Sequence, residues 1–288
     1  MRRIAPVQGL TLFILIGLVL LTLVFRNQIP LWRSQLYFYA ILLGLLFVLN
    51  ISSQRWGAGP IGGIISDLSP IAFIISIYQS LGNMIQYLQP DIDPYLIQID
   101  LFLFGVHPTV WMERWINPWF TDLMSLAYIS YYFLPVILVI TLYLKGRGEE
   151  FGQIMFILTF GYYLSFIGYI LFPAIGPRFT LAHLQTVPLE GSFFTDLVRD
   201  LLNAIEHNKR DCMPSGHTQI ALMVLFLAYR YEKTIFAIFF PIICGLVLST
   251  VYLRYHYVID LIAGITLAIG CILIAPHLYR MWKVESRK

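Results

Sequence analysis

Charged residues are scarce in this sequence. Only 12% of its 288 residues are Asp, Glu, Lys or Arg, whereas soluble domains contain about 25%. Apolar residues make up 58% of the chain and aromatic residues 16%. The formal net charge is only +3, which does not suggest a nucleic-acid partner. This composition is typical of an integral membrane protein.

Cysteine is scarce as well. The chain contains Cys212, Cys244 and Cys271, and the last two lie inside apolar runs. An odd number of cysteines in these positions forms neither a disulfide framework nor a Cys-x-x-Cys metal motif. The cysteines therefore predict no crosslink and no metal centre.

Long uncharged runs, in contrast, are abundant. A helix needs about 17 to 25 mostly apolar residues to cross the hydrocarbon core of a membrane. No small-residue cleavage site follows the first run, so we interpret it as a retained span and not as a signal peptide. We predict an all-α integral membrane protein with about eight transmembrane helices. The eight segments are residues 9–25, 34–54, 68–89, 123–144, 151–172, 213–229, 234–253 and 256–276.

Residues 91–116 differ from these runs. Pro94, Asp100, Gly105 and Pro108 interrupt pieces rich in Leu, Phe and Trp that are too short to cross a membrane. We therefore expect an amphipathic helix that lies at the membrane interface.

Lys and Arg residues are more frequent on one side of this eight-span topology. That side carries both termini, with Arg2, Arg3, Arg287 and Lys288. Because cytoplasmic connections are enriched in basic residues, we expect both termini in the cytoplasm. The connections that precede residues 213 and 256 are separated by two spans, so both lie on the opposite, extracytoplasmic face. Polar groups on these two connections can therefore meet.

His256 and Asp260 stand four residues apart at the start of the last span. On a helix this spacing puts both side chains on one face. A carboxylate that accepts a hydrogen bond from one ring nitrogen fixes the tautomer and leaves the other nitrogen free to attack. The pair is a candidate for an activated histidine nucleophile, with a purely structural pair as the alternative.

The tetrapeptide Pro214-Ser215-Gly216-His217 begins the sixth span. Pro suits the first turn of a helix, and Gly permits close approach of the backbone. Free amide groups at a helix start form an anion site, so we expect a phosphate at Ser215 and Gly216. His217 would lie beside that anion as a general acid. A helix cap followed by an unrelated histidine is the alternative.

Two arginines are candidates for phosphate binding. Arg178 follows Gly176-Pro177 at the end of the fifth span, and Arg254 lies two residues before His256. A guanidinium group binds phosphate oxygens in a bidentate manner. An arginine just past a span is also what snorkelling to the lipid headgroups produces.

Together these motifs resemble those of the type 2 phosphatidic acid phosphatase superfamily of membrane phosphatases and phosphotransferases. The resemblance implies a six-span catalytic core over residues 68–278. Residues 1–67 would then be two additional N-terminal spans, and residues 279–288 a basic C-terminal tail.

The resemblance also implies a role for each candidate residue. His256 would be the nucleophile that becomes phosphorylated, oriented by Asp260, while His217 would protonate the leaving group and Arg178 would hold the phosphate. The implied reaction needs no metal and no cofactor. Its substrate would be a phospholipid or a polyprenyl-phosphate-type lipid.

Two positions depart from the family pattern and remove positive charge. The family has a lysine where Leu171 stands, seven residues before Arg178, and an arginine where Thr250 stands. The residues that we expect to compensate are Arg254, Lys209 or Arg210.

These reduced motifs and the run from Asp100 to Pro108 resemble the branch that contains inositol-phosphorylceramide synthases. In that branch the phosphoryl group passes with its substituent to a lipid alcohol instead of water. The resemblance therefore leaves hydrolysis and inositol-phosphate transfer as alternatives.

The residues alone leave two further functions open. His217, His256 and Asp260 could supply three ligands to a divalent metal ion. Intramembrane histidine and aspartate could also relay protons in a transporter, although no inverted repeat is visible in the sequence.

Overall fold

The computed structural model describes residues 5–55 and 60–285, and within these ranges it contains helices and no strand. The prediction of an all-α integral membrane fold is confirmed. Arg2, Arg3, Arg287 and Lys288, which contribute to the predicted orientation, lie outside the described residues.

Every predicted span contains helix, but not every one qualifies as a crossing by itself. Six helices of the described chain are long and apolar enough to cross a membrane. A seventh crossing is formed if α6 (Pro118–Ile129) and α7 (Leu134–Leu144), which meet at 46°, count as one span. The sixth predicted span, α11 (Gly216–Tyr231), has only 16 residues. The six are α1 (Pro6–Val24), α2 (Trp32–Arg55), α3 (Pro60–Leu81), α8 (Gly148–Leu171), α12 (Lys233–Tyr252) and α13 (Val258–Glu285).

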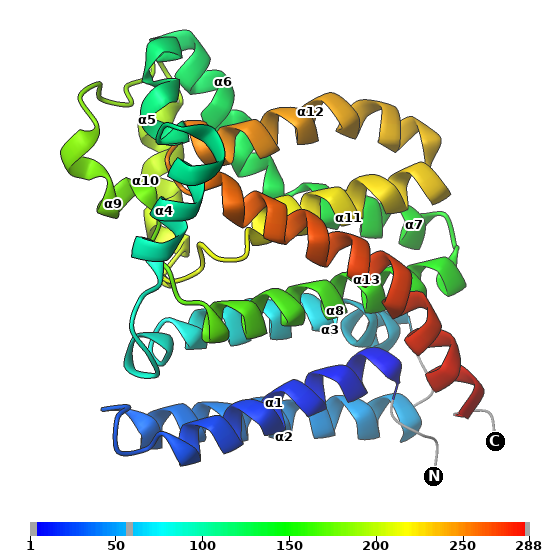
Figure 1. The fold of residues 1–288 in the computed structure, drawn as a ribbon. Coiled ribbons are helices and arrows are strands. Elements are labelled where there is room, and N and C mark those ends of the chain that lie inside the picture. The colour runs from blue at the N-terminus through cyan, green and yellow to red at the C-terminus, as the bar shows by residue number, and fades with distance from the viewer. Residues whose placement is uncertain (1–4, 56–59, 286–288) are drawn as a thin grey trace.

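The helix α11 lies at the centre of the bundle. It packs against α7, α8, α12 and α13, and Figure 1 shows it enclosed by these helices. Its side chains Ile220, Met223, Val224 and Leu227 are buried in the largest apolar cluster of the described chain. A helix covered by protein on most sides can be shorter than a lipid-facing span, because its ends need not reach the headgroups.

The bend between α6 and α7 has a local cause. The 3-10 turn η3 (Ser130–Tyr132) separates the two helices, and Pro135 stands in the first turn of α7. Proline lacks the N–H that would continue the hydrogen bonds of α6.

The third predicted span, residues 68–89, coincides closely with the candidate span Ile65–Tyr87, but this span is not one continuous helix. Helix α3 ends at Leu81, and Gln86 falls in the 3-10 turn η1 (Ile85–Tyr87). At Gly82 a Cβ atom would come within 3.1 Å of the His207 carbonyl oxygen, so the chain turns here against the backbone that precedes α11. The amphipathic pattern of residues 79–89 reflects this turn.

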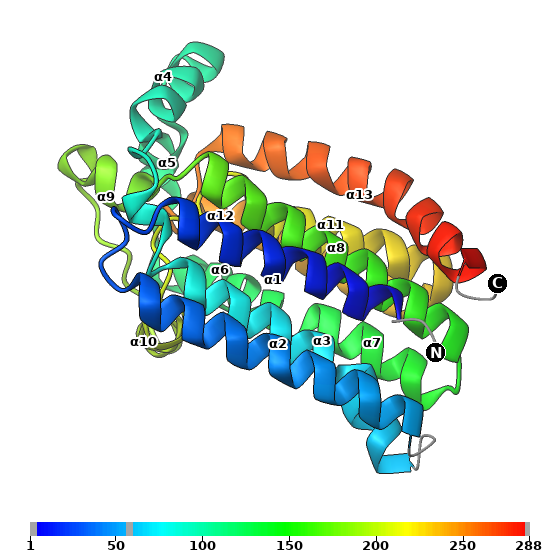
Figure 2. The same cartoon turned by 90° about the horizontal axis from the view of Figure 1, so that it is seen from below.

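The two N-terminal helices form an antiparallel pair on one side of the bundle. Figures 1 and 2 both show α1 beside α2, next to α3 and α8. Polar contacts fix this position: Gln35 Nε2 donates to the Ser80 carbonyl at 2.9 Å, and Thr11 Oγ1 lies 2.9 Å from the Tyr163 hydroxyl. The pair therefore packs specifically on the remaining helices.

Residues 91–116 form short helices at one end of the bundle, and α4 projects from it (Figure 2). They are α4 (Asp93–Phe104), α5 (Pro108–Trp111) and the 3-10 turn η2 (Met112–Trp115). Helix α4 exposes 88% of Phe102 but buries Asp93 and Asp100. An amphipathic helix on the surface of a soluble protein does the opposite, because it buries its apolar side chains and exposes its charged ones.

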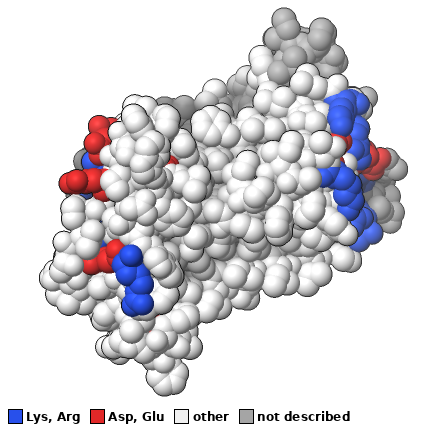
Figure 3. Space-filling view, turned by 90° about the horizontal axis from the view of Figure 1, so that it is seen from above, with Lys and Arg blue, Asp and Glu red and all other residues white. Residues whose placement is uncertain are grey.

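Charged residues gather at the two ends of the bundle, and a broad uncharged zone separates them (Figure 3). Both termini lie at one end (Figure 1), where Lys145 pairs with Glu232. The connections that follow α8 and α12 meet at the other end, as two intervening spans require.

Candidate active site

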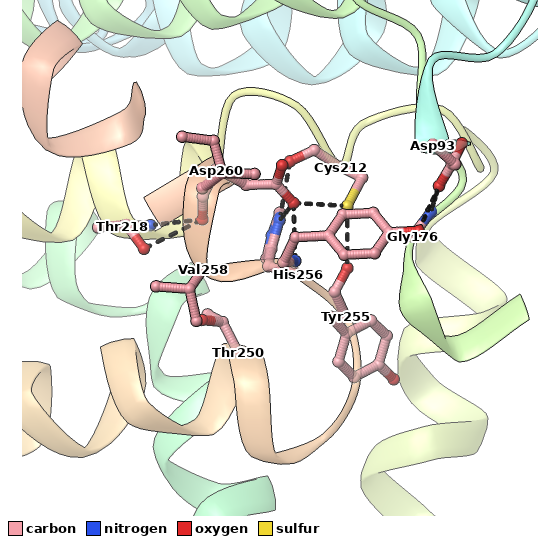
Figure 4. Close-up of polar contacts among 12 residues, drawn as sticks. Asp93, Gly176, Cys212, Thr218, Thr250, Tyr255, His256, Val258 and Asp260 are labelled. Carbon is pink, nitrogen blue, oxygen red and sulfur yellow. Dashed lines mark hydrogen bonds and ion pairs between the residues drawn. The ribbon is translucent and has the colours of Figure 1, made fainter. Parts of the chain in front are cut away.

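His256 lies in the short connection between α12 and α13 and is almost completely buried. Its Nδ1 atom is 2.8 Å from the carbonyl oxygen of Cys212 and 3.5 Å from Asp260 Oδ2 (Figure 4). A carbonyl oxygen only accepts hydrogen bonds, so Nδ1 carries the hydrogen and Nε2 is the unprotonated nitrogen. The group closest to Nδ1, which fixes the tautomer, is thus the Cys212 carbonyl, and the expected Asp260 carboxylate lies farther from Nδ1.

Asp260 stands in the first turn of α13 and is fully buried. Its Oδ2 accepts hydrogen bonds from the Tyr257 amide at 2.9 Å and from the Cys212 thiol at 2.8 Å. The bond to Tyr257 is the return half of a capping box, because Tyr257 directly precedes the helix. Burial, together with the charge of Asp260, raises the pKa of the Cys212 thiol well above its usual value, so the thiol remains a donor.

Cys212, His256 and Asp260 are the His, Cys or acidic residues that come close enough to share a metal ion in the described chain. Their ligand atoms lie within 4.8 Å of one another, but they are engaged in the hydrogen bonds above. His217, which the sequence suggested as a third ligand, does not belong to this group.

His217 lies in the first turn of α11. Its ring is 5.6 Å from the ring of His256 and packs against Tyr128 at 4.5 Å and Tyr131 at 4.2 Å, measured between centroids. Its Nε2 atom is 3.9 Å from Glu206 Oε1. The two imidazoles therefore face a common space, as their positions in the sequence suggested.

Ser215 and Gly216 hold α11 in place but do not face this space. The Ser215 amide, expected to bind a phosphate, donates instead to the Asp260 carbonyl at 3.0 Å. The Ser215 hydroxyl oxygen accepts from the Thr218 amide at 3.3 Å, as a helix cap does. At Gly216 a Cβ atom would collide with the Tyr169 hydroxyl.

Arg178 is presented by the short helix α9 (Pro177–Thr180), after Gly176 with a φ of 88°. Its guanidinium group lies 5.6 Å from the ring of Tyr255, and Nη1 is 3.4 Å from the Tyr255 hydroxyl. Among the residues that the structure describes, no carboxylate lies within ion-pair distance of Arg178. Its charge is available to an anion.

A cavity of about 270 Å³, here called the polar cavity, joins these groups. Glu206 and Asp211 also line it. Lys209 contributes a second positive charge, whereas Arg210 forms an ion pair with Asp91 at 2.6 Å. The basic, histidine and tyrosine side chains that line the polar cavity include Arg178, Lys209, His217, Tyr255 and His256.

Arg254 lies outside the polar cavity, although the sequence suggested it as a phosphate ligand. It adopts a left-handed conformation with φ of 66°, and its Nη2 atom donates to Glu113 Oε1 at 2.8 Å and to the Val187 carbonyl at 2.6 Å. The left-handed backbone directs this side chain toward η2, away from the His256 imidazole.

Two carboxylates of α4, which the sequence analysis did not single out as site residues, hold the loops of the site. Asp93 accepts from the amides of Ile175 at 2.9 Å and Gly176 at 2.8 Å, next to Arg178 (Figure 4). Asp100 accepts from the amides of Val258 at 2.8 Å and Ile259 at 2.9 Å, at the start of α13. Their spacing of seven residues in an apolar segment is the signal that predicts a shared buried face.

Comparison with known proteins identifies the family of the chain. The profile of the PAP2 superfamily matches residues 94–274. A PA-phosphatase related-family protein of Dictyostelium discoideum is 28% identical over 179 residues, which cover 53% of this chain and 31% of that protein. The match therefore spans about a third of the relative's length. No solved structure matches the chain. With its profile match extending over most of the bundle, this chain belongs to the PAP2 superfamily.

Proposed function

We propose that the protein is an integral membrane lipid phosphoester phosphatase or phosphotransferase that works through a phosphohistidine at His256. One observation carries the proposal. An imidazole with its Nδ1 hydrogen held by the Cys212 carbonyl shares a cavity with His217 and with the unpaired guanidinium group of Arg178.

In the first half of the reaction, Arg178 and Lys209 bind the phosphate oxygens. His256 Nε2 attacks phosphorus, so that a P–N bond forms and the P–O bond to the alcohol breaks. His217 supplies the proton that the leaving oxygen takes up. Asp260 and the Cys212 carbonyl stabilise the hydrogen on Nδ1 while the ring carries positive charge.

In the second half, His217 takes the proton from water or from a second alcohol. The oxygen of that acceptor attacks phosphorus and displaces His256 Nε2. Each step is assigned to a side chain of the polar cavity, so we propose a metal-independent reaction.

We propose that this chemistry takes place on the extracytoplasmic face. Support comes from the basic residues at the end with the termini, among them Arg147 and Lys283. At the site end, Arg178 faces the polar cavity, so its charge has a role other than setting the orientation.

A further cavity supports transfer of a phosphorylated headgroup, as in the inositol-phosphorylceramide synthase branch, as the second candidate function. This cavity of about 340 Å³ shares Arg178 and Tyr255 with the polar cavity, and Gln185 and Arg199 line it. A phosphodiester has a substituent that stays on phosphorus during transfer, and a polar space beside Arg178 gives it room. A phosphate monoester has no such substituent.

The test is a labelled phosphoenzyme. Purified protein is mixed with phosphatidic acid, polyprenyl diphosphate, or phosphatidylinositol plus ceramide, and phosphate release is followed against lipid transfer. His256→Ala should abolish the covalent label. His277→Ala is the matched control, because His277 is exposed near the far end of α13, the helix that follows His256. A His256→Ala protein that still accumulates covalent phosphate would contradict the proposal.

A further inference from the structure

A large apolar cavity adjoins the polar cavity. It has a volume of about 420 Å³, within the range of about 300 to 1,000 Å³ that ligand sites occupy. The walls come from α3, α7 and α8, and are mainly apolar and aromatic. The two cavities share three lining residues, which are Glu206, Asp211 and His217.

The shared end of the apolar cavity is acidic. Glu206 Oε1 accepts a hydrogen bond from the Tyr132 hydroxyl at 2.6 Å, and Asp211 Oδ2 accepts one from the Tyr78 hydroxyl at 2.5 Å. No described Lys or Arg lies within ion-pair distance of either carboxylate. Burial, reinforced by the charge of Asp211, raises the pKa of Glu206 to about 8. The basic residues of the polar cavity, Arg178 and Lys209, do not line the apolar cavity.

Polar atoms without partners lie in this otherwise apolar wall. Thr159 is fully buried, and its Oγ1 has no hydrogen-bond partner among the described residues; the same holds for Gln79 Oε1 and His217 Nε2. All three residues line the apolar cavity. Because buried polar groups are rarely left unpaired, these atoms indicate a ligand with polar groups of its own.

We propose that the apolar cavity binds the lipid alcohol that takes part in the reaction, a neutral lipid with a long alkyl chain. Its hydroxyl group lies at His217, and Glu206 and Asp211 accept hydrogen bonds from its hydroxyl or amide donors. This assignment rests on the proposed function and names the substrate class of the same site.

Charge separates the two substrates. A phosphate in the apolar cavity would face two carboxyl groups without a basic side chain, which is costly for a buried anion. The polar cavity offers it Arg178 and Lys209. A neutral alcohol meets the opposite conditions, because carboxyl groups accept its hydrogen bonds and an apolar wall covers its chain.

His217 stands where the two cavities meet and can serve both halves of the reaction. When the alcohol accepts, its O–H proton passes to His217, the O–P bond forms and the P–N bond to His256 breaks. When the alcohol leaves, the P–N bond to His256 forms, the O–P bond breaks, and His217 gives its proton to the alcohol oxygen.

The experiment uses the full chain in vesicles of neutral phospholipid, with a ceramide-type alcohol that carries a photoactivatable group in its alkyl chain. After irradiation, mass spectrometry locates the crosslinks. We expect them on α3, α7 and α8. An excess of unlabelled alcohol should compete, whereas a short-chain soluble phosphoester, which occupies only the polar cavity, should compete at least about tenfold less well.

Adjacent residues of α7 provide the variant and its control. Val136 lines the cavity, and Val136→Phe should weaken labelling by about tenfold or more, because overpacking a filled site costs about 1 to 3 kcal/mol. Ile137 is exposed and lies outside the cavity lining, so Ile137→Phe should label like the unchanged protein.

Equal labelling of Val136→Phe and Ile137→Phe, or equal competition by the unlabelled alcohol and the short-chain phosphoester in the unchanged protein, would overturn the assignment. A short-chain soluble phosphoester, which does not need the apolar cavity, separates this result from failure of the proposed function. If it phosphorylates His256 while the lipid alcohol fails to label the cavity, only the assignment of the cavity is wrong. If labelling succeeds without a phosphoenzyme, the proposed chemistry is wrong.

Discussion

Removing the Asp93 carboxylate should separate the two loops that form the site. Asp93 is buried and accepts three hydrogen bonds, from the amides of Ile175 and Gly176 and from the Tyr257 hydroxyl at 2.8 Å. In Asp93→Ala the two amides lose their partner, and each buried unpaired group costs about 1 to 3 kcal/mol. The native conformation of the loop before Arg178 is therefore destabilised by about 2 to 6 kcal/mol.

This cost should appear in the chemistry, because a displacement of about 1 Å at a catalytic group lowers rates by about 100-fold. We expect phosphoenzyme formation from a short-chain phosphoester to fall by about that factor in Asp93→Ala, together with the Tm. Tyr257→Phe removes one neutral donor and should cost only about 1 kcal/mol. Asp200→Ala, on the exposed surface, serves as the control. Wild-type rates and Tm in Asp93→Ala would refute the reasoning.

Three further predictions follow from single contacts. Because the native chain keeps a proton on Glu206 that the unfolded chain releases between pH of about 4.5 and about 8, stability should fall as the pH rises through this window. Glu206→Gln should flatten that dependence of Tm on pH, and an unchanged slope would count against the burial of this acid. Arg178→Lys should slow phosphoenzyme formation by about 10- to 100-fold, because a bidentate charged contact is lost. A rate equal to that of the wild type would show that Arg178 does not bind the phosphate. Arg254→Met should lower the Tm, because it leaves Glu113 as an unpaired buried charge. The folded fraction of this variant should still form phosphoenzyme within about threefold of the wild-type rate. A loss of activity without a loss of stability would contradict a structural role for Arg254.

Hydropathy predicted most of the fold, since long uncharged runs have few alternatives to a membrane helix. It predicted the third span, but not that the helix α3 ends at Leu81 inside that span, because the chain turns at Gly82 against a backbone more than a hundred residues away. It also could not tell that α11 is enclosed by other helices. Such features depend on tertiary contacts and leave no local pattern.

The candidate site, too, has features that the sequence predicts and others that depend on tertiary structure. The four-residue spacing predicted that His256 and Asp260 are neighbours, and topology predicted that His217 lies on their face of the membrane. The Cys212 carbonyl could not be foreseen, because backbone groups are present at every residue. The direction of Arg254 depends on its positive φ, which a sequence does not reveal for a residue other than glycine.

The contact between α4 and α13 also bears on the order in which the molecule is assembled. Asp100 and Val258, which it binds, are 158 residues apart, so this contact waits until the last helix is in the membrane. Contacts at such separations form late because a long loop must close first. A partly synthesised chain can thus hold most of its bundle while the two histidines are still apart. The surroundings of His256 are therefore complete only after α13 has been made and has met α4.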